Sequence, residues 1–153
     1  MSKRRTAHTT FVIERTFASP PAQVFAAWSD VKAKAHWFKG PAGWTEKERK
    51  LEFRVGGRER LVGSWQEGKV STFDATYRDI VPGERVVYAY DMQVNATPIS
   101  VSLATVEFRP QGKGTSMKFT EQATFLDDDA GGRERGTNLL MDNLEAALRL
   151  EAA

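Results

Sequence analysis

Few side chains in this sequence are of the types that carry out chemistry, and their placement excludes most catalytic arrangements. The chain has 153 residues, two histidines and no cysteine. This composition excludes disulfides, thiolate nucleophiles and metal sites built from several His or Cys ligands. His8 lies near the N-terminus and His36 lies beside Trp37, while Ser64 stands in G-S-W, which is not a nucleophile elbow. We therefore predict no catalytic residues, no metal and no cofactor.

Two charged residues, Arg15 and Glu121, fall in runs whose other same-side neighbours are apolar. Arg15 shares a strand face with Ile13 and Phe17, and Glu121 shares one with Phe119. A buried charge is costly unless it has a partner. Each residue is therefore interpreted either as one half of a structural ion pair at a rim or as a polar anchor for the head group of a ligand.

Large rings are abundant for a chain of this size, with four Trp, three Tyr and nine Phe. The tyrosines, Tyr77, Tyr88 and Tyr90, combine an apolar body with a polar tip. Such rings either fill a core or line a binding site, and the sequence alone leaves both readings open.

Strand and helix signals alternate in a simple order along the chain. Two short helices are predicted over 20–29 and 31–38, with Asp30 as the cap of the second. A long helix is predicted from about 130 to 151, with Asp127 to Asp129 as its start and apolar residues spaced by three and four. Period-two alternation predicts strands over 9–17, 70–81, 84–93, 99–109 and 114–125.

Long antiparallel strands joined by tight turns form a strongly curved sheet. A helix of twenty residues spans about 30 Å, which matches a strand of about ten residues, so the last helix is long enough to lie along the concave face. A gap between helix and sheet is a place where small apolar molecules bind.

The ordered set of motifs resembles the START-like (SRPBCC) superfamily, in the branch similar to the C-terminal domain of the activator of the heat-shock-protein-90 ATPase. The resemblance covers residues 9–150. Its motifs are F-V-I-E-R-T-F-A-S-P-P-A-Q-V-F-A-A-W-S-D, H-W-F-K-G-P-A-G-W, R-V-G-G-R, Y-R-D-I-V-P-G-E-R-V-V-Y, G-T-S-M-K-F-T and G-T-N-L-L-M-D-N-L-E-A-A-L.

The resemblance implies an α+β helix-grip fold, in which a curved seven-stranded antiparallel sheet surrounds a long C-terminal helix and two short helices follow the first strand. It also implies a cavity between sheet and helix. Trp37, Phe38 and Trp44 are expected at its mouth or lid. The expected walls are Leu140, Met141 and Leu144 on the helix, and Tyr77, Tyr88, Tyr90 and Phe119 on the sheet.

In the implied fold the first and last strands are adjacent and antiparallel, which makes Arg15 and Glu121 candidates for an ion pair across these strands. Many relatives have His where Glu121 stands, which removes support for a proton-transfer role carried over from them.

Composition limits the partners of the molecule. The formal charge is only +2, which is too small for general attraction to nucleic acid. No apolar run is long enough to span a membrane, and M-S-K-R-R-T-A-H lacks the apolar segment of a signal peptide. We expect a flexible tail over residues 1–8, a single START-like domain over 9–153 and a cytoplasmic location. Exposed strand edges and the rings near Trp44 are compatible with a homodimer.

Three functions remain at this point. We favour binding of a small hydrophobic or amphipathic molecule in the cavity. The alternative is a cyclase, aromatase or hydrolase on the same fold, with Glu121, Arg15, Tyr88, Tyr90 and His36 as candidates. The third is contact with a chaperone, by analogy with the named relative, although that relative carries an additional N-terminal domain.

Overall fold

The computed structural model describes residues 5–126 and 130–152. Within them the chain forms seven strands and three helices. In chain order these are β1 (Thr6–Phe17), α1 (Pro21–Ser29), α2 (Val31–Ala35), β2 (Trp44–Leu51), β3 (Arg58–Trp65), β4 (Val70–Val81), β5 (Arg85–Val94), β6 (Thr97–Gln111), β7 (Gly114–Leu126) and α3 (Ala130–Ala152).

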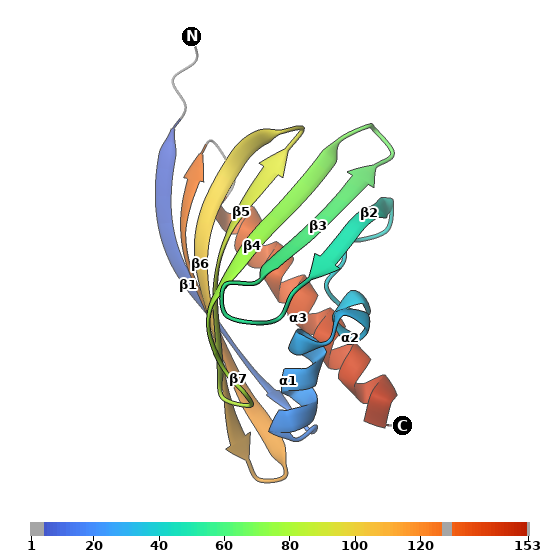
Figure 1. The fold of residues 1–153 in the computed structure, drawn as a ribbon, viewed down its shortest axis with the longest axis vertical. Coiled ribbons are helices and arrows are strands. Elements are labelled where there is room, and N and C mark those ends of the chain that lie inside the picture. Colours follow the sequence, from blue (N-terminus) through green and yellow to red (C-terminus); the bar gives the residue numbers. More distant parts are fainter. Residues whose placement is uncertain (1–4, 127–129, 153) are drawn as a thin grey trace.

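The strands form one antiparallel sheet in the order β1-β7-β6-β5-β4-β3-β2. Figure 1 shows the sheet curving around α3, which lies along its concave side, while α1 and α2 lie together near the C-terminal end of α3. The predicted α+β helix-grip fold, with two short helices after the first strand, is confirmed.

Alternation along the strands decides which side chains form the core. Phe73 and Tyr77 of β4 and Met117 and Phe119 of β7 are buried, whereas their neighbours along each strand are more exposed. The side chains at every second position point to the same face of a sheet, so these residues define the concave face. The buried residues of α3 include Met141, Leu144 and Leu148, at the spacing of one helical face.

A side-chain cap marks the start of α2, and a turn follows its end. The Asp30 carboxylate accepts a hydrogen bond from the Ala33 amide at 3.0 Å, as predicted for the cap of α2. The helix is shorter than predicted, because it ends at Ala35 and the following residues form a turn. This turn carries Trp37 and Phe38 toward the interior, where both rings pack against the core.

The N-terminal boundary differs from the sequence prediction. β1 begins at Thr6, and residues 6–8 pair with the end of β7, although they were assigned to the flexible tail. Their side chains are exposed, so alternation gave no burial signal there, and the pairing is made by the backbone. Residues 1–4 and the predicted helix start at Asp127 to Asp129 lie outside the described residues.

Candidate ligand-binding cavity

A cavity of about 460 Å³ lies between the concave face of the sheet and α3. This volume falls within the range of about 300–1,000 Å³ that is typical of small-molecule sites. Its lining is mainly aromatic and aliphatic. Most of the predicted site residues line it, namely Trp37, Phe38, Trp44, Tyr88, Tyr90, Phe119, Glu121, Leu140 and Met141.

The cavity has a closed floor and an open side. The floor lies by the short helices, where Trp28 and Trp37 are almost fully buried and their ring centroids lie 4.7 Å apart. The exposed lining residues are Lys39, Lys69 and Gly136, which mark the opening between α3 and the ends of the strands. Trp37 was expected at the mouth, but it is only 1% exposed and forms part of the floor.

Trp44 reaches the rim of the cavity from the start of β2. Its ring packs against Gly40 and Gly63, at positions where a Cβ atom would overlap with it. The two glycines therefore leave the space in which this ring lies. Trp44 is half-buried and contacts the core, which places it between the interior and solvent, as expected of a residue at the mouth.

One wall of the cavity carries a polar cluster around Glu121, whose side chain is buried. The Tyr90 hydroxyl donates to this carboxylate at 2.8 Å, and the Ser102 hydroxyl donates to it at 2.9 Å. Arg133, in the first turn of α3, lies 3.6 Å from Glu121 and donates to the Tyr90 oxygen at 3.1 Å and to the Ser100 hydroxyl at 2.8 Å. The cluster joins β5, β6 and β7 to α3.

Burial decides the electrostatics of this wall. Loss of water around Glu121 raises the pKa of its carboxyl, and the hydrogen bond from Tyr90 and the charge of Arg133 oppose that change without cancelling it. The pKa of the Tyr90 hydroxyl is raised as well, first by burial and then by the adjacent Glu121 charge. Tyr90 therefore remains a neutral donor throughout the physiological pH range.

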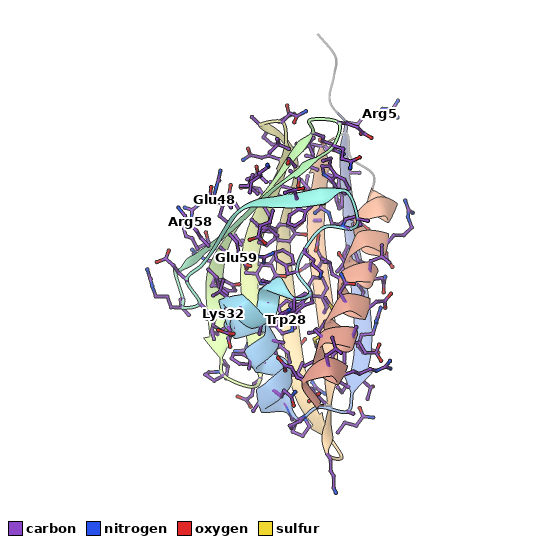
Figure 2. All side chains as sticks on the ribbon, turned by 90° about the vertical axis from the view of Figure 1, so that its right-hand side faces the viewer. Arg5, Trp28, Lys32, Glu48, Arg58 and Glu59 are labelled. Carbon is purple, nitrogen blue, oxygen red and sulfur yellow. The ribbon has the colours of Figure 1, made fainter. Side chains whose placement is uncertain are left out.

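A second polar cluster lies at the floor and connects α2 to the sheet. The Lys34 ammonium lies 2.7 Å from a Glu59 carboxylate oxygen, and each side chain is 2% exposed. The Tyr77 hydroxyl donates to the same oxygen at 2.6 Å, and Lys34 also contacts the Tyr77 oxygen at 3.4 Å. Figure 2 shows Glu59 on the sheet and Trp28 beside the short helices.

Aromatic rings surround the Lys34 ammonium. Its Nζ lies 4.7 Å from the ring centroid of Phe38, 5.5 Å from that of Trp28 and 5.8 Å from that of Tyr88. Burial lowers the pKa of Lys34, while the charge of Glu59 partly opposes this effect. Ring faces attract a cation, and a buried ion pair needs such supporting contacts to offset its desolvation.

Three predicted site residues do not line the cavity. Tyr77 is engaged with Glu59 beneath the floor, and Leu144 is buried further along α3. Arg15 does not pair with Glu121, which was its candidate partner. It lies opposite Met117, whereas Glu121 lies opposite Phe11, because the register between β1 and β7 is offset from the one that the pairing required.

Arg15 instead ties β1 to α3. Its guanidinium donates to the Asp142 carboxylate at 2.8 Å and to the Asn138 side-chain oxygen at 3.1 Å. Asp142 is exposed, so this is an ion pair at the rim of the molecule. Such pairs contribute about 0–1 kcal/mol to stability.

The main residues that sequence reasoning missed are Lys34, Glu59 and Arg133. Lys34 stands in V-K-A-K-A, a segment typical of a solvated helix. A signal for Glu59 was present, because it alternates with Leu61 and so shares the inward face of β3. Arg133 stands in G-G-R-E-R-G, where the sequence does not distinguish it from Arg135.

The described residues contain neither of two further kinds of site, a metal centre or a membrane-spanning helix. In this part of the chain, no group of three or more His, Cys, Asp or Glu side chains is arranged to hold a metal ion. Nor is any helix there both long and apolar enough to cross a membrane.

Comparisons with known proteins agree with this architecture. A protein from Rhizobium leguminosarum is 45% identical and superposes with a TM-score of 0.92, over 97% of this chain and 99% of that one. The Mll3558 protein from Rhizobium loti is 41% identical, with a TM-score of 0.87, over 94% and 99% of the two chains. An AHSA1-like protein from Aeromonas hydrophila shares the fold, with 18% identity, a TM-score of 0.75 and coverage of 94% of both chains.

The comparison with curated proteins gave no match. The family model described as "Activator of Hsp90 ATPase homolog 1-like protein" matches residues 18–149. Because this match spans most of the chain, the protein belongs to the family of activator of Hsp90 ATPase homolog 1-like proteins, within the START-like (SRPBCC) superfamily.

Proposed function

We propose that this protein binds one small hydrophobic or amphipathic molecule in the cavity between the sheet and α3. The observation that carries the proposal is a space of about 460 Å³ lined mainly by rings and aliphatic side chains. Burial of apolar surface stabilises a complex by about 25 cal/mol per Å² before the costs of association are subtracted. A molecule that fills this space therefore has a substantial driving force for entry.

The polar groups of the walls support binding of this kind rather than a solvent-filled gap. The Tyr90 hydroxyl is hydrogen-bonded to both Glu121 and Arg133, and these two form an ion pair, so the three side chains are held in fixed positions at the edge of an apolar space. Small-molecule sites typically combine apolar walls with a few fixed polar groups that orient the ligand.

The test uses the neutral fluorescent probe N-phenyl-1-naphthylamine. We expect saturable binding with one probe per chain, and a rise in melting temperature that grows with probe concentration, because the probe binds the folded state only. The variant Leu140→Trp fills the cavity and should weaken binding at least about tenfold. Met92→Trp fills it from the sheet side and serves as a second variant should Leu140→Trp fail to fold.

The matched control is Leu139→Trp, because Leu139 is adjacent in sequence but is 61% exposed and lies outside the cavity lining. It should bind the probe like the unmodified protein. Equal binding by Leu139→Trp and both cavity-filling variants contradicts the proposal, as does failure of the probe to bind.

A second candidate function, proton transfer to or from the bound molecule, is favoured by one observation. Glu121 lines the cavity, and burial raises the pKa of its carboxyl toward the range in which a general acid is effective. The test is a titration of the Glu121 carboxyl by ¹³C NMR. A midpoint at or below that of an ordinary glutamate removes this candidate and leaves ligand binding unaffected.

A further inference from the structure

The charged side chains that line the cavity are distributed unevenly between its interior and its opening. They are Lys34, Lys39, Lys69, Glu121 and Arg133. Lys34 is buried at the floor and pairs with Glu59 at 2.7 Å. Arg133 lies on the wall, 3.6 Å from the buried carboxylate of Glu121. Each of these inner cations therefore has an acidic partner, and the interior has almost no net charge.

The two remaining cations, Lys39 and Lys69, lie at the opening. Both side chains are exposed and line the cavity. In the part of the chain that the structure describes, neither ammonium group forms an ion pair or a hydrogen bond. The opening therefore carries two positive charges that no acidic side chain of the lining offsets.

The backbone places these two lysines around Trp44 at the rim. Lys39 precedes Gly40, against which the Trp44 ring packs. Trp65 lies opposite Trp44 in the pairing of β2 with β3, and its amide donates to the Lys69 carbonyl at 2.8 Å. Figure 1 shows the start of β2 and the turn between β3 and β4 at the same end of the sheet. The fold thus brings lysines from two separate segments to one rim.

This distribution of charge selects both the type of ligand and its orientation. An anionic group inside the cavity loses its water beside the Glu121 carboxylate and finds only cations that are already paired, which is costly. At the opening the same group keeps much of its water and is attracted by Lys39 and Lys69. A neutral molecule gains nothing from the two lysines, and a cationic one is repelled by them.

We propose that the ligand is an amphipathic anion, an apolar molecule with one negatively charged group, which enters apolar end first. The apolar part occupies the uncharged interior. The anionic group stays in the opening beside Lys39 and Lys69. This inference rests on the proposed function and specifies the charge and the orientation of the molecule that it binds.

The probes are decanoate, 1-decanol and decyltrimethylammonium, which share an unbranched alkyl chain and differ in charge. Their affinities are measured by displacement of N-phenyl-1-naphthylamine, and the readout is the ratio of the decanoate affinity to the 1-decanol affinity. The double variant Lys39→Gln/Lys69→Gln should lower this ratio about fivefold, the magnitude of two exposed ion pairs. Decyltrimethylammonium should bind the unmodified protein more weakly than decanoate does.

Salt provides a second readout that does not depend on the folding of a variant. Raising the ionic strength from about 0.01 M to about 1 M shortens the Debye length from about 30 Å to about 3 Å, so attraction between exposed charges is screened. The affinity ratio of the unmodified protein should therefore fall at high salt. Both probes carry the same alkyl chain, so the effect of salt on hydrophobic burial largely cancels in the ratio.

The matched control is Lys113→Gln/Lys118→Gln. It removes the same number of charges from exposed lysines that lie outside the cavity lining. It should leave the affinity ratio close to that of the unmodified protein, because the proposed effect belongs to the opening and not to the net charge of the chain.

Three results overturn the inference. One is an affinity ratio that falls no further in Lys39→Gln/Lys69→Gln than in the control, another is a ratio that salt leaves unchanged, and the third is decyltrimethylammonium binding as tightly as decanoate. If N-phenyl-1-naphthylamine binds and decanoate does not displace it, the inference about charge fails and the proposed function stands. If neither N-phenyl-1-naphthylamine nor any of the three alkyl probes binds, both fail.

Discussion

The three tyrosines that point into the concave face differ in what their hydroxyls do. Those of Tyr77 and Tyr90 donate to buried carboxylates at 2.6 Å and 2.8 Å, whereas Tyr88 lines the cavity and its hydroxyl makes no hydrogen bond to another described residue. Loss of a hydroxyl that satisfies a buried carboxylate leaves that charge underpaired, but loss of an unpaired hydroxyl removes only a desolvation cost.

We therefore expect replacement of tyrosine by phenylalanine to change the free energy of unfolding differently at these three positions. Tyr77→Phe and Tyr90→Phe should each lower the free energy of unfolding by about 1–3 kcal/mol. Tyr88→Phe should leave it unchanged or raise it. Urea unfolding of the three variants measures these differences, and a loss for Tyr88→Phe equal to the other two contradicts the assignment of its hydroxyl as unpaired.

The buried Glu121 carboxyl makes stability depend on pH in a definite direction. Its pKa is raised in the folded protein, mainly by burial, so between the ordinary glutamate value and the raised one the folded state holds more protons than the unfolded state. Stability therefore falls as pH rises through that interval. Glu121→Gln removes this titration while keeping an acceptor for Tyr90 and Ser102.

The expected result is a difference in free energy of unfolding between Glu121→Gln and the unmodified protein that changes with pH. Denaturant unfolding is measured from pH 4 to pH 8, and the stability of Glu121→Gln relative to the unmodified protein should increase as the pH rises. A difference that is constant across this range, or that changes in the opposite direction, contradicts the raised pKa of Glu121.

On the strands, side chains of the site were recognisable from sequence where alternation marked them. Tyr88, Tyr90 and Phe119 follow period two in long strands, so their shared faces could be recognised. Lys34 could not be recognised, because its burial results from the packing of α2 onto the sheet. The partner of Glu121 was misassigned because adjacency of two strands does not fix their register.

At the scale of elements, β2 and β3 depend on a close approach that only glycine allows. The Trp44 ring lies over Gly63, where an added Cβ atom would overlap with the indole. Gly63→Ala must therefore displace Trp44 from the rim, and we expect a loss of about 1–3 kcal/mol, as for other overpacked sites. Thermal unfolding measures the loss, and the Trp fluorescence spectrum reports the displacement.

Gly136→Ala in α3 is the matched control with the opposite expected sign. No atom lies within 4 Å of a Cβ at Gly136, and alanine favours a helix over glycine by about 0.5–1 kcal/mol. The variant should therefore be stabilised. If Gly63→Ala is as stable as the unmodified protein, the described seating of Trp44 is incorrect.

Elements with strong periodicity were predicted well, and those without it were not. The strands over 70–81 and 114–125 and the long C-terminal helix agree closely with β4, β7 and α3. β2 was missed, because W-T-E-K-E-R-K-L is highly charged and lacks an apolar alternation. It pairs only with β3, at the edge of the sheet, where charged side chains are common. Its side chains are exposed or half-buried, so the sequence shows no alternation of apolar and polar residues.

At the scale of the whole molecule, the cavity results from how a straight helix meets a curved sheet. α3 packs closely near the short helices, through Leu144 and Leu148, and is separated from the sheet near Gly132 and Gly136, which line the cavity. The resemblance to the START-like superfamily predicted this arrangement. It placed the mouth or lid at the end with the short helices, through Trp37, Phe38 and Trp44, but Trp37 is buried there as part of the floor.

Methionine methyl groups offer the most direct test of cavity binding. Met92 and Met141 line the cavity, whereas Met117 is fully buried outside its lining. The measurement is a ¹³C-methyl NMR titration of methionine-labelled protein with N-phenyl-1-naphthylamine. The account predicts that the Met92 and Met141 signals shift together to saturation while the Met117 signal stays in place. Unchanged Met92 and Met141 signals at a saturating probe concentration would contradict it.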